Sequence, residues 1–417
     1  MDNHNYGSTL KPDRRLRQSL GVKAERLNEK INFNPSTAKP GDTLTIRIPK
    51  LASCSLYEPG SIWLTFDLVL SADTSVVNNV AKNLIKRIKT TIGGKQLRDI
   101  NEYYLYETFL DLWLPEYERS NMVLQGITKS KEMRNSRSST LPPTTDPEEL
   151  KVCAIFGKRY GIQLNPELFA EHGPLYTYAL DEEVIEEIEL NESKNVVVGP
   201  AAGYYHLENI ALEYVKIKHD GLGETTMINY DRGHSVLYKV VTSTPVAIIQ
   251  ETDTIIKQGI TFGRKSMIGI LFLFEDANFK PGERDSEKFL NPNIISVRIA
   301  FDGNNNQIYN HGLTSINMYD ETKRYFTTER NESGKKDENV YNSIFKYYND
   351  KYCLWIDTRS TKDNKLHGSG MKTENRNDGF QIEITKKPTA PIMKMYTYVI
   401  ADALCTIKNN SVQSITY

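Results

Sequence analysis

The sequence predicts an all-β protein made of two tandem eight-stranded antiparallel jelly rolls, with short helices in the loops. Short apolar segments alternate with polar residues at a period of two and are separated by Gly and Pro turns, which is typical of β-sandwiches. The order of these segments in the first half recurs in the second half. We therefore expect a basic N-terminal arm over 1–40, a first jelly roll over 41–220, an interdomain linker over 221–235 and a second jelly roll over 236–417.

Length and composition support a folded protein of two domains. The 417 residues exceed the roughly 250–300 at which one hydrophobic core usually stops growing. The net charge of −1 gives the chain as a whole no strong attraction to nucleic acid. The N-terminus shows no apolar segment of the signal-peptide type, so we expect synthesis and assembly inside a cell.

The first half carries the clearest strand and helix patterns. Alternating apolar residues predict strands at 43–48 and 61–71. Two further strands, 84–92 and 95–100, are joined by a Gly-Gly pair, which supplies the positive φ of a tight hairpin. The next segment, NEYYLYETFLDLW, has aromatic residues at three- and four-residue spacing and predicts a short amphipathic helix.

Three other segments complete the first half. Residues 119–160 are rich in Ser, Thr, Pro, Lys and Arg without periodicity, and we interpret them as an elaborated surface loop. The acidic segment 181–189 fits either an exposed strand or a short helix, and no chemistry is assigned to it. A closing strand is expected at 207–218.

The second half repeats this plan. Strands are expected at 266–276 and 294–301, and a turn at Asp302-Gly303-Asn304 leads to a further strand. The helical pattern SINMYDETKRYF follows, and 395–408 supplies the closing strand. Equivalent turns and equivalent closing strands lie about half the chain apart, which favours an internal duplication.

The usual signatures of catalysis are missing from the sequence. The seven histidines have no H-x-x-x-H or H-E-x-x-H spacing, and the four cysteines form no C-x-x-C pair. Gly368–Thr373 resembles a phosphate loop but has Met371 where the glycine before the lysine should stand. We therefore predict that the protein is not an enzyme, and we name no catalytic, cofactor-binding or metal residue and no cofactor.

Basic residues gather in two places. Those of the N-terminal arm are candidates for contacts with the inner face of an assembly or with a neighbour: Lys11, Arg14, Arg15, Arg17, Lys23 and Arg26. A second group surrounds the first hairpin: Lys82, Lys86, Arg87, Lys89, Lys95 and Arg98. The second group could meet phosphates, but a solvated or interface-facing strand is the favoured alternative.

Four parts of the sequence resemble a known family. They are IKRIKTTIGGKQLRDINEYYLYETF, YYHLENIALEYVKI, the block from FGRKSMIGILFLFED to MYDETKRYF, and the block from CLWIDTRSTKDNKLHGSGMK to YTYVIADALCTIKN. Together they are similar to the hexon-like, double jelly-roll major capsid proteins of the adenovirus and tectivirus lineage, and most similar to those of polinton- and adintovirus-type elements. The resemblance covers most of 40–417.

This resemblance implies a structural protein of the virion capsid. It implies pseudo-hexagonal homotrimers in an icosahedral shell around double-stranded DNA, with no catalytic residues to carry over. Its partners would be copies of itself, neighbouring capsomers, and penton and minor capsid proteins. The basic arm would lie on the inner side of the shell, near neighbouring capsomers, an internal membrane or the genome.

Two other classes of protein also fit tandem β-sandwiches. One is a carbohydrate- or protein-binding protein that uses Tyr-rich loops, since the chain has 24 Tyr residues. The other is a double-sandwich glycan amidase, which would need carboxylates converging in a cleft between the domains.

Overall fold

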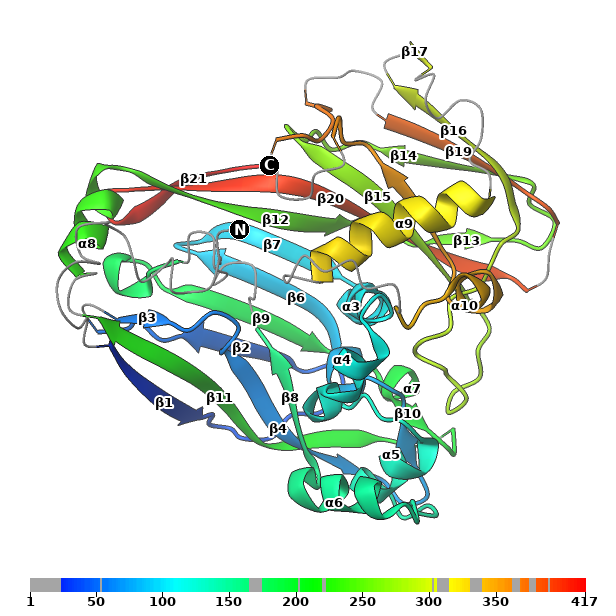
Figure 1. Cartoon of the computed structure of the whole chain (residues 1–417), viewed down its shortest axis with the longest axis horizontal. Helices are drawn as coiled ribbons and strands as arrows, with labels where there is room; N and C mark the ends of the chain where they lie inside the picture. Colours follow the sequence, from blue (N-terminus) through cyan, green and yellow to red (C-terminus); the bar gives the residue numbers. More distant parts are fainter. Residues whose placement is uncertain are drawn as a thin grey trace.

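The structure is a computed structural model. It describes residues 24–52, 55–164, 175–201, 203–219, 223–301, 304–305, 315–330, 340–361, 368–374, 380–388 and 391–417. Strands dominate these residues and form stacked, mostly antiparallel sheets, with the helices gathered mainly at one end (Figure 1).

Eight main strands build the first jelly roll. They are β1 (Ala24–Asn32), β2 (Thr43–Ile48), β4 (Trp63–Leu70), β6 (Ile85–Ile92), β7 (Lys95–Asn101), β8 (Arg159–Gln163), β9 (Val184–Leu190) and β11 (Tyr205–His219). One sheet has the order β1-β11-β4-β8 and the other the order β2-β9-β6-β7. Counted along the chain, these orders are 1-8-3-6 and 2-7-4-5. The short strands β3 (Ser55–Tyr57), β5 (Ser75–Val76) and β10 (Val197–Val198) are additions to this plan.

The second jelly roll has the same strand order. Its strands are β12 (His234–Ser243), β14 (Ile255–Ile260), β15 (Met267–Asp276), β16 (Ile294–Phe301), β17 (Asn304–Asn305), β18 (Cys353–Asp357), β19 (Phe380–Lys386) and β20 (Met393–Lys408). Their sheets run β12-β20-β15-β18 and β14-β19-β16-β17, again 1-8-3-6 and 2-7-4-5. The predicted fold class, two tandem jelly rolls, is confirmed.

One sheet of the first roll and one sheet of the second roll together form a continuous central sheet. Strand β7 of the first roll lies beside β12 of the second, with Asp99 opposite Thr242 in a parallel bridge. Two added strands, β13 (Ala247–Ile249) and β21 (Ser411–Thr416), pair with β20. The first outer sheet, β1-β11-β4-β8, and the second outer sheet, β14-β19-β16-β17, lie on opposite sides of this central sheet (Figure 1).

The core follows from this layering. Strand β15 has the burial of a fully covered strand: nine of its ten residues, Met267–Glu275, are buried. An uninterrupted apolar run is the expected sequence of a strand covered on both faces. Strand β9 instead alternates, with Val184, Glu186, Ile188 and Leu190 buried, so the ambiguous acidic segment is a strand.

In each roll, the long connection that follows strand 5 contains helices. Helix α3 (Tyr103–Asp111) and helix α9 (Ser315–Arg330) lie where aromatic spacing predicts them. The other helices of the described residues, besides those of the segment described next, are α2 (Val80–Asn83), α7 (Ser193–Val196), α8 (Gly223–Arg232), α10 (Ile344–Asn349) and the 3-10 helix η3 (Thr177–Ala179). The predicted turn residues Asp302 and Gly303 lie outside the described residues.

The prediction of an elaborated loop over 119–160 was wrong. This part of the chain holds α4 (Glu116–Ser120), η2 (Met122–Gln125), α5 (Lys131–Ser138) and α6 (Pro147–Phe156). The helix signals are at the ends: the Asp146 carboxylate accepts hydrogen bonds from the Glu148 and Glu149 amides, and Pro147 occupies the first turn of α6. Helices this short and polar show little apolar periodicity, which explains the error.

The predicted domain boundaries also needed correction. Residues Ala24–Asn32, assigned to the arm, form β1 and pair with β11 along their whole length. This edge strand has too few apolar residues to show a period of two. The predicted linker 221–235 contains α8, and β12 already begins at His234.

Candidate functional site

The described residues form an extended interface between the two rolls, with an aromatic cluster at one end. The rings of Phe109 on α3 and Phe326 on α9 meet edge to face, with centroids 5.2 Å apart. Trp113 stacks on Phe326 at 6.2 Å, and Phe289 contacts Phe109 at 5.8 Å. All four side chains are buried. The cluster therefore joins the equivalent helices of the two rolls through apolar packing.

A second part of the interface is polar and buried. The connection 277–293, between β15 and β16 of the second roll, reaches the first roll. There the Arg284 guanidinium donates to Glu275 at 2.9 Å and, across the boundary, to the Asn83 side chain at 2.9 Å and the Asn195 carbonyl at 2.7 Å. Because buried charges are costly unless paired, this network demands a specific fit between the rolls.

A second ion pair crosses the same boundary. The Arg119 guanidinium of the first roll donates to Glu287 of the second at 2.6 Å, and both side chains are at most 7% exposed. The Asn78 amide donates to the same Glu287 oxygen at 2.9 Å. The 277–293 connection is therefore held by charges from both rolls.

The backbone of this connection also touches the first roll. The Gly199 amide donates to the Gly282 carbonyl at 3.0 Å, and Gly282 has a φ of +84°. A Cβ atom at Gly282 would overlap the Gly199 carbonyl oxygen. Only glycine allows both this conformation and this approach.

The seam beside the central sheet adds further contacts. The Tyr238 hydroxyl on β12 donates to the Leu97 carbonyl on β7 at 3.0 Å. Strand β21 lies along the first hairpin, where Lys95 donates to the Val412 carbonyl and the Val412 amide donates to Glu182 at 2.8 Å. Aromatic packing, buried ion pairs and strand contacts thus link the described parts of the two rolls at several places.

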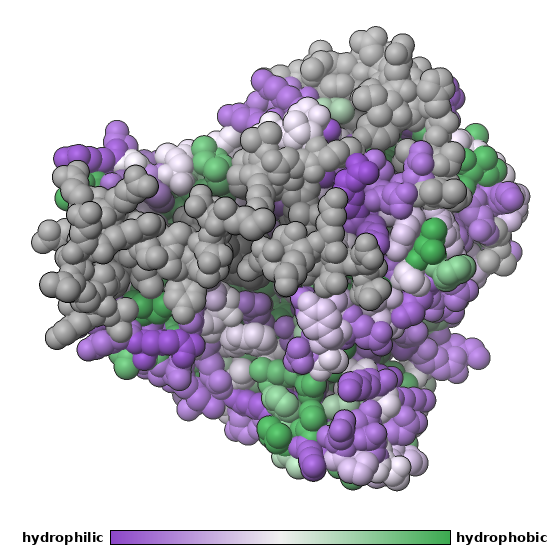
Figure 2. All heavy atoms as spheres, in the orientation of Figure 1, coloured by the Kyte–Doolittle hydropathy of each residue, from purple (hydrophilic) through white to green (hydrophobic). Residues whose placement is uncertain are grey.

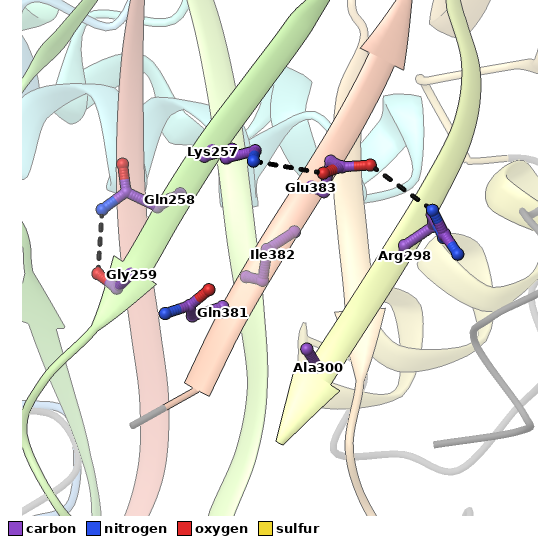
Figure 3. A pocket seen from close by; sticks show the side chains of 8 residues that line it. All are labelled: Lys257, Gln258, Gly259, Arg298, Ala300, Gln381, Ile382 and Glu383. Carbon is purple, nitrogen blue, oxygen red and sulfur yellow. Dashed lines mark hydrogen bonds and ion pairs between the residues drawn. The ribbon is translucent and has the colours of Figure 1, made fainter. Parts of the chain in front are cut away.

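Each of the two outer sheets carries a hollow on its described surface. On the second outer sheet, a shallow hollow of about 450 Å³ contains Glu383 between Lys257 and Arg298, with N–O distances of 3.7 and 3.8 Å (Figure 3). Gln381 lies between Gly259 and Ala300 at one end of this face (Figure 3). These strands present a lone carboxylate between two cations, which is unlike a general acid–base pair.

The first outer sheet has a larger open hollow of about 710 Å³, which includes Trp63 from β4, Glu213 from β11 and Arg26 from β1. Hydrophilic side chains cover most of the described surface in Figure 2, and hydrophobic ones form small separate groups. Among the described residues, no helix combines the length and the apolar character that a membrane span requires.

The described residues hold no cluster of three or more potential metal ligands. The described cysteines, Cys153, Cys353 and Cys405, are free thiols and buried. Burial raises the pKa of Cys405 to about 11 and that of Cys353 further. Such thiols stay protonated at neutral pH and are poor nucleophiles.

Five of the six basic residues around the first hairpin pair with carboxylates of the protein itself. Lys95 donates to a backbone carbonyl, as described above, and Lys82 and Arg98 are buried. All of these residues except Lys95 form ion pairs: Lys82 with Glu107 and Asp111, Lys86 with Glu189, Arg87 with Asp99, Lys89 with Glu187, and Arg98 with Glu186. A phosphate would have to displace these carboxylates, so the alternative of a solvated or interface-facing strand is favoured.

The six candidate residues of the arm fall into two groups. Lys11, Arg14, Arg15, Arg17 and Lys23 lie outside the described residues. Arg26 lies on β1, where its guanidinium forms two hydrogen bonds with the same Glu58 oxygen, at 3.0 and 2.7 Å.

The interface residues on 277–293 were not found from the sequence. Arg284 and Glu287 bind partners more than 80 residues away, and no local period marks them. The only local signal is Pro281-Gly282, which indicates a turn but not its contact.

Comparison with known proteins identifies the fold. No protein-family model matches the chain, and no curated protein sequence does. Among solved structures, the chain is similar to VP54 of PBCV-1 fitted into a reconstruction of the virophage Sputnik, with a TM-score of 0.59, 12% identity, and 96% of this chain and 98% of that chain covered. The Sputnik virophage structure gives a TM-score of 0.58 at 11% identity, covering 96% and 91%. The mavirus major capsid protein gives 0.52 at 9%, covering 93% and 89%.

These similarities agree with the strand orders of both rolls. The chain therefore has the double jelly-roll fold, over nearly its whole length, of the capsid proteins with which it aligns.

Proposed function

We propose that this protein is the major capsid protein of an icosahedral double-stranded DNA virus, with a structural and not an enzymatic role. The observation that carries the proposal is the repeated strand order, 1-8-3-6 and 2-7-4-5 in both rolls, together with one extensive interface that fixes the rolls to each other. Two similar wedges in a fixed relation are what a pseudo-sixfold building block needs from each chain.

We propose further that three chains form a homotrimer of pseudo-hexagonal outline. Six similar rolls can then surround one axis, and such units can tile a surface with neighbouring capsomers. Penton and minor capsid proteins would occupy the positions that this unit does not fill. The sequence segments quoted above favour a polinton- or adintovirus-type source, and the virion capsid is the proposed location.

The test is the mass and shape of the purified full chain. Size-exclusion chromatography with light scattering should give three times the mass of the 47.7 kDa chain, and negative-stain microscopy should show a pseudo-hexagonal outline. A protein that stays a single chain at all concentrations, or that binds a defined glycan on an array as a monomer, would overturn the proposal.

We propose that the basic arm, now limited to 1–23, lies on the inner side of the shell. It contains Lys11, Arg14, Arg15, Arg17 and Lys23 in a nearly neutral protein, and such a segment attracts phosphates of a genome or of lipid headgroups. Deleting 1–23 should reduce particle assembly or DNA retention. Particles that assemble and package DNA as before would contradict this role.

A further inference from the structure

The contact between β7 and β12 joins the two rolls within one chain. The two strands equivalent to these partners lie at sheet edges and have no such contact among the described residues. Inside the chain, strand 5 of the first roll, β7, lies beside strand 1 of the second roll, β12. Strand 1 of the first roll is β1, and it forms one edge of the first outer sheet. Strand 5 of the second roll is β17, at the end of the described strands of the second outer sheet.

Strand β1 pairs on only one side among the described residues. All nine of its residues pair with β11, and its other edge carries no described partner strand. Its side chains are exposed from Glu25 to Asn32 except for the half-buried Glu29. A long unpaired edge of this kind is a template for pairing with another chain.

The apolar residues of β1 mark the surface that needs a cover. Leu27 is 44% exposed and Ile31 41% exposed. Ile31 lies opposite Leu212 on β11, so the two side chains share one face of the sheet, yet Leu212 is only 1% exposed. The core-facing side of the outer sheet therefore extends to β1, but the apolar side chains of β1 lie outside the layer that covers Leu212.

Strand β12 shows how the equivalent strand looks when its free edge is covered. On its buried face, Val236, Tyr238 and Val240 are 1%, 5% and 3% exposed. Tyr238 also donates a hydrogen bond across the joint to β7. The first roll thus covers the edge of β12, whereas no described part of the same chain covers the edge of β1.

We propose that the free edge of β1 is covered by a second copy of this chain, by the β16–β17 edge of that copy's second roll. This contact is head-to-tail, because it joins two different surfaces, and it repeats between copies the relation of β7 to β12 within one chain. The inference rests on the proposed function, since it names the surface through which the capsid unit assembles.

The first experiment compares two leucines of equal exposure on equivalent strands. Leu27→Glu places a charge on the β1 edge, and Leu237→Glu places one on β12, where Leu237 is also 44% exposed. Light scattering should show that Leu27→Glu loses the oligomer and has the 47.7 kDa mass of one chain, while Leu237→Glu keeps the mass of the unaltered protein. Circular dichroism and thermal unfolding would verify that both variants are folded.

The second experiment tests the direction of the contact. Ala300 lies on β16 opposite Asn305 of β17, so Ala300→Glu should block the other half of the contact. Each variant alone should be a single chain, whereas a mixture of Leu27→Glu and Ala300→Glu proteins should form a complex of two chains through the one intact pair of surfaces. No complex in the mixture would overturn the head-to-tail contact.

The outcomes separate this inference from the proposed function. If the unaltered protein is a single chain, the proposed function fails. If it is an oligomer and Leu27→Glu leaves it intact, or if both Leu variants dissociate it equally, only the β1 contact fails. Hydrogen exchange tests the contact without any variant. The β1 amides that do not bond to β11 should exchange more slowly in the oligomer than in the dissociated chain, and equal rates would refute the contact.

Discussion

The rings of Phe109 and Phe326 meet edge to face at an interplanar angle of 89°, although 217 residues separate them in the chain, as 326 − 109 = 217. One ring belongs to the helix after strand 5 of the first roll, and the other belongs to its counterpart in the second roll. The equivalent helices of the duplicated halves are thus in direct contact, and their packing is part of what holds the rolls together.

Truncating Phe109 should destabilise the whole chain. Both rings are fully buried, so Phe109→Ala should lower the free energy of unfolding by about 3–5 kcal/mol. Phe345→Ala is the matched control, because Phe345 is 84% exposed and its loss should change the free energy by no more than about 0.5 kcal/mol. Denaturant unfolding of both variants measures the difference, and equal effects would contradict the role of the cluster.

Removing the Arg284 guanidinium should cost more than removing an exposed one. Arg284→Met leaves the buried Glu275 without its cation, so a loss of about 3–5 kcal/mol is expected. Arg298→Met breaks the exposed contact with Glu383 at 3.8 Å and should cost about 0–1 kcal/mol. Chemical denaturation of the two variants provides the comparison. Similar losses for both would show that the 277–293 connection does not depend on this ion pair.

Alanine substitutions at two glycines should distinguish the cost of backbone strain from the cost of steric overlap. Gly41 and Gly282 have the same φ of +84°, but a Cβ at Gly41 meets nothing within 4 Å. Gly41→Ala should therefore cost only the strain of a left-handed alanine, about 1–2 kcal/mol. Gly282→Ala should cost about 1–3 kcal/mol more, because its Cβ meets the Gly199 backbone. Thermal unfolding would measure both, and equal midpoints would show that the approach of the two backbones is unimportant.

A carboxylate at the boundary between the rolls should give a pH-dependent stability. Burial raises the pKa of Glu102, against the lowering effect of its hydrogen bond to Tyr104. The folded state therefore binds this proton more tightly than the unfolded state, and stability falls as the pH rises through the interval from the ordinary pKa to the raised one. Glu102→Gln removes this loss.

The midpoint of thermal unfolding should thus be higher for Glu102→Gln than for the unaltered protein at about pH 7, and the two should converge at about pH 4, where both side chains are neutral. Glu251→Gln is the control, because Glu251 is exposed in the turn before β14. A pH-independent difference for Glu102→Gln would contradict the burial of a charge as its cause.

The sequence predicts the parts of the fold whose causes are local. The Gly-Gly hairpin, the buried strand at Met267–Asp276 and the helix from Tyr103 follow from turn chemistry and periodicity, and the structure confirms all three. The repeated order of these segments predicts two similar β-domains, and the long loops favour the jelly roll among antiparallel sandwiches.

The rest depends on contacts between distant residues. Strand β1 owes its conformation to the ladder with β11, about 190 residues later, and not to its own composition. Arg284 and Glu287 resemble ordinary surface charges until the partners from the first roll are known. An edge strand and a docking connection are therefore visible only after folding has brought the two halves together.

The passage of one sheet through both rolls has a geometric consequence. Neighbouring strands in a sheet are rotated by a narrow range of angles, which is set by backbone chirality. Because β7 and β12 are neighbours in the same sheet, this natural coiling contributes to the angle between the wedges inside each polypeptide before it meets any other. The curvature of a larger assembly would then be encoded partly in main-chain stereochemistry, where no single side-chain substitution easily alters it.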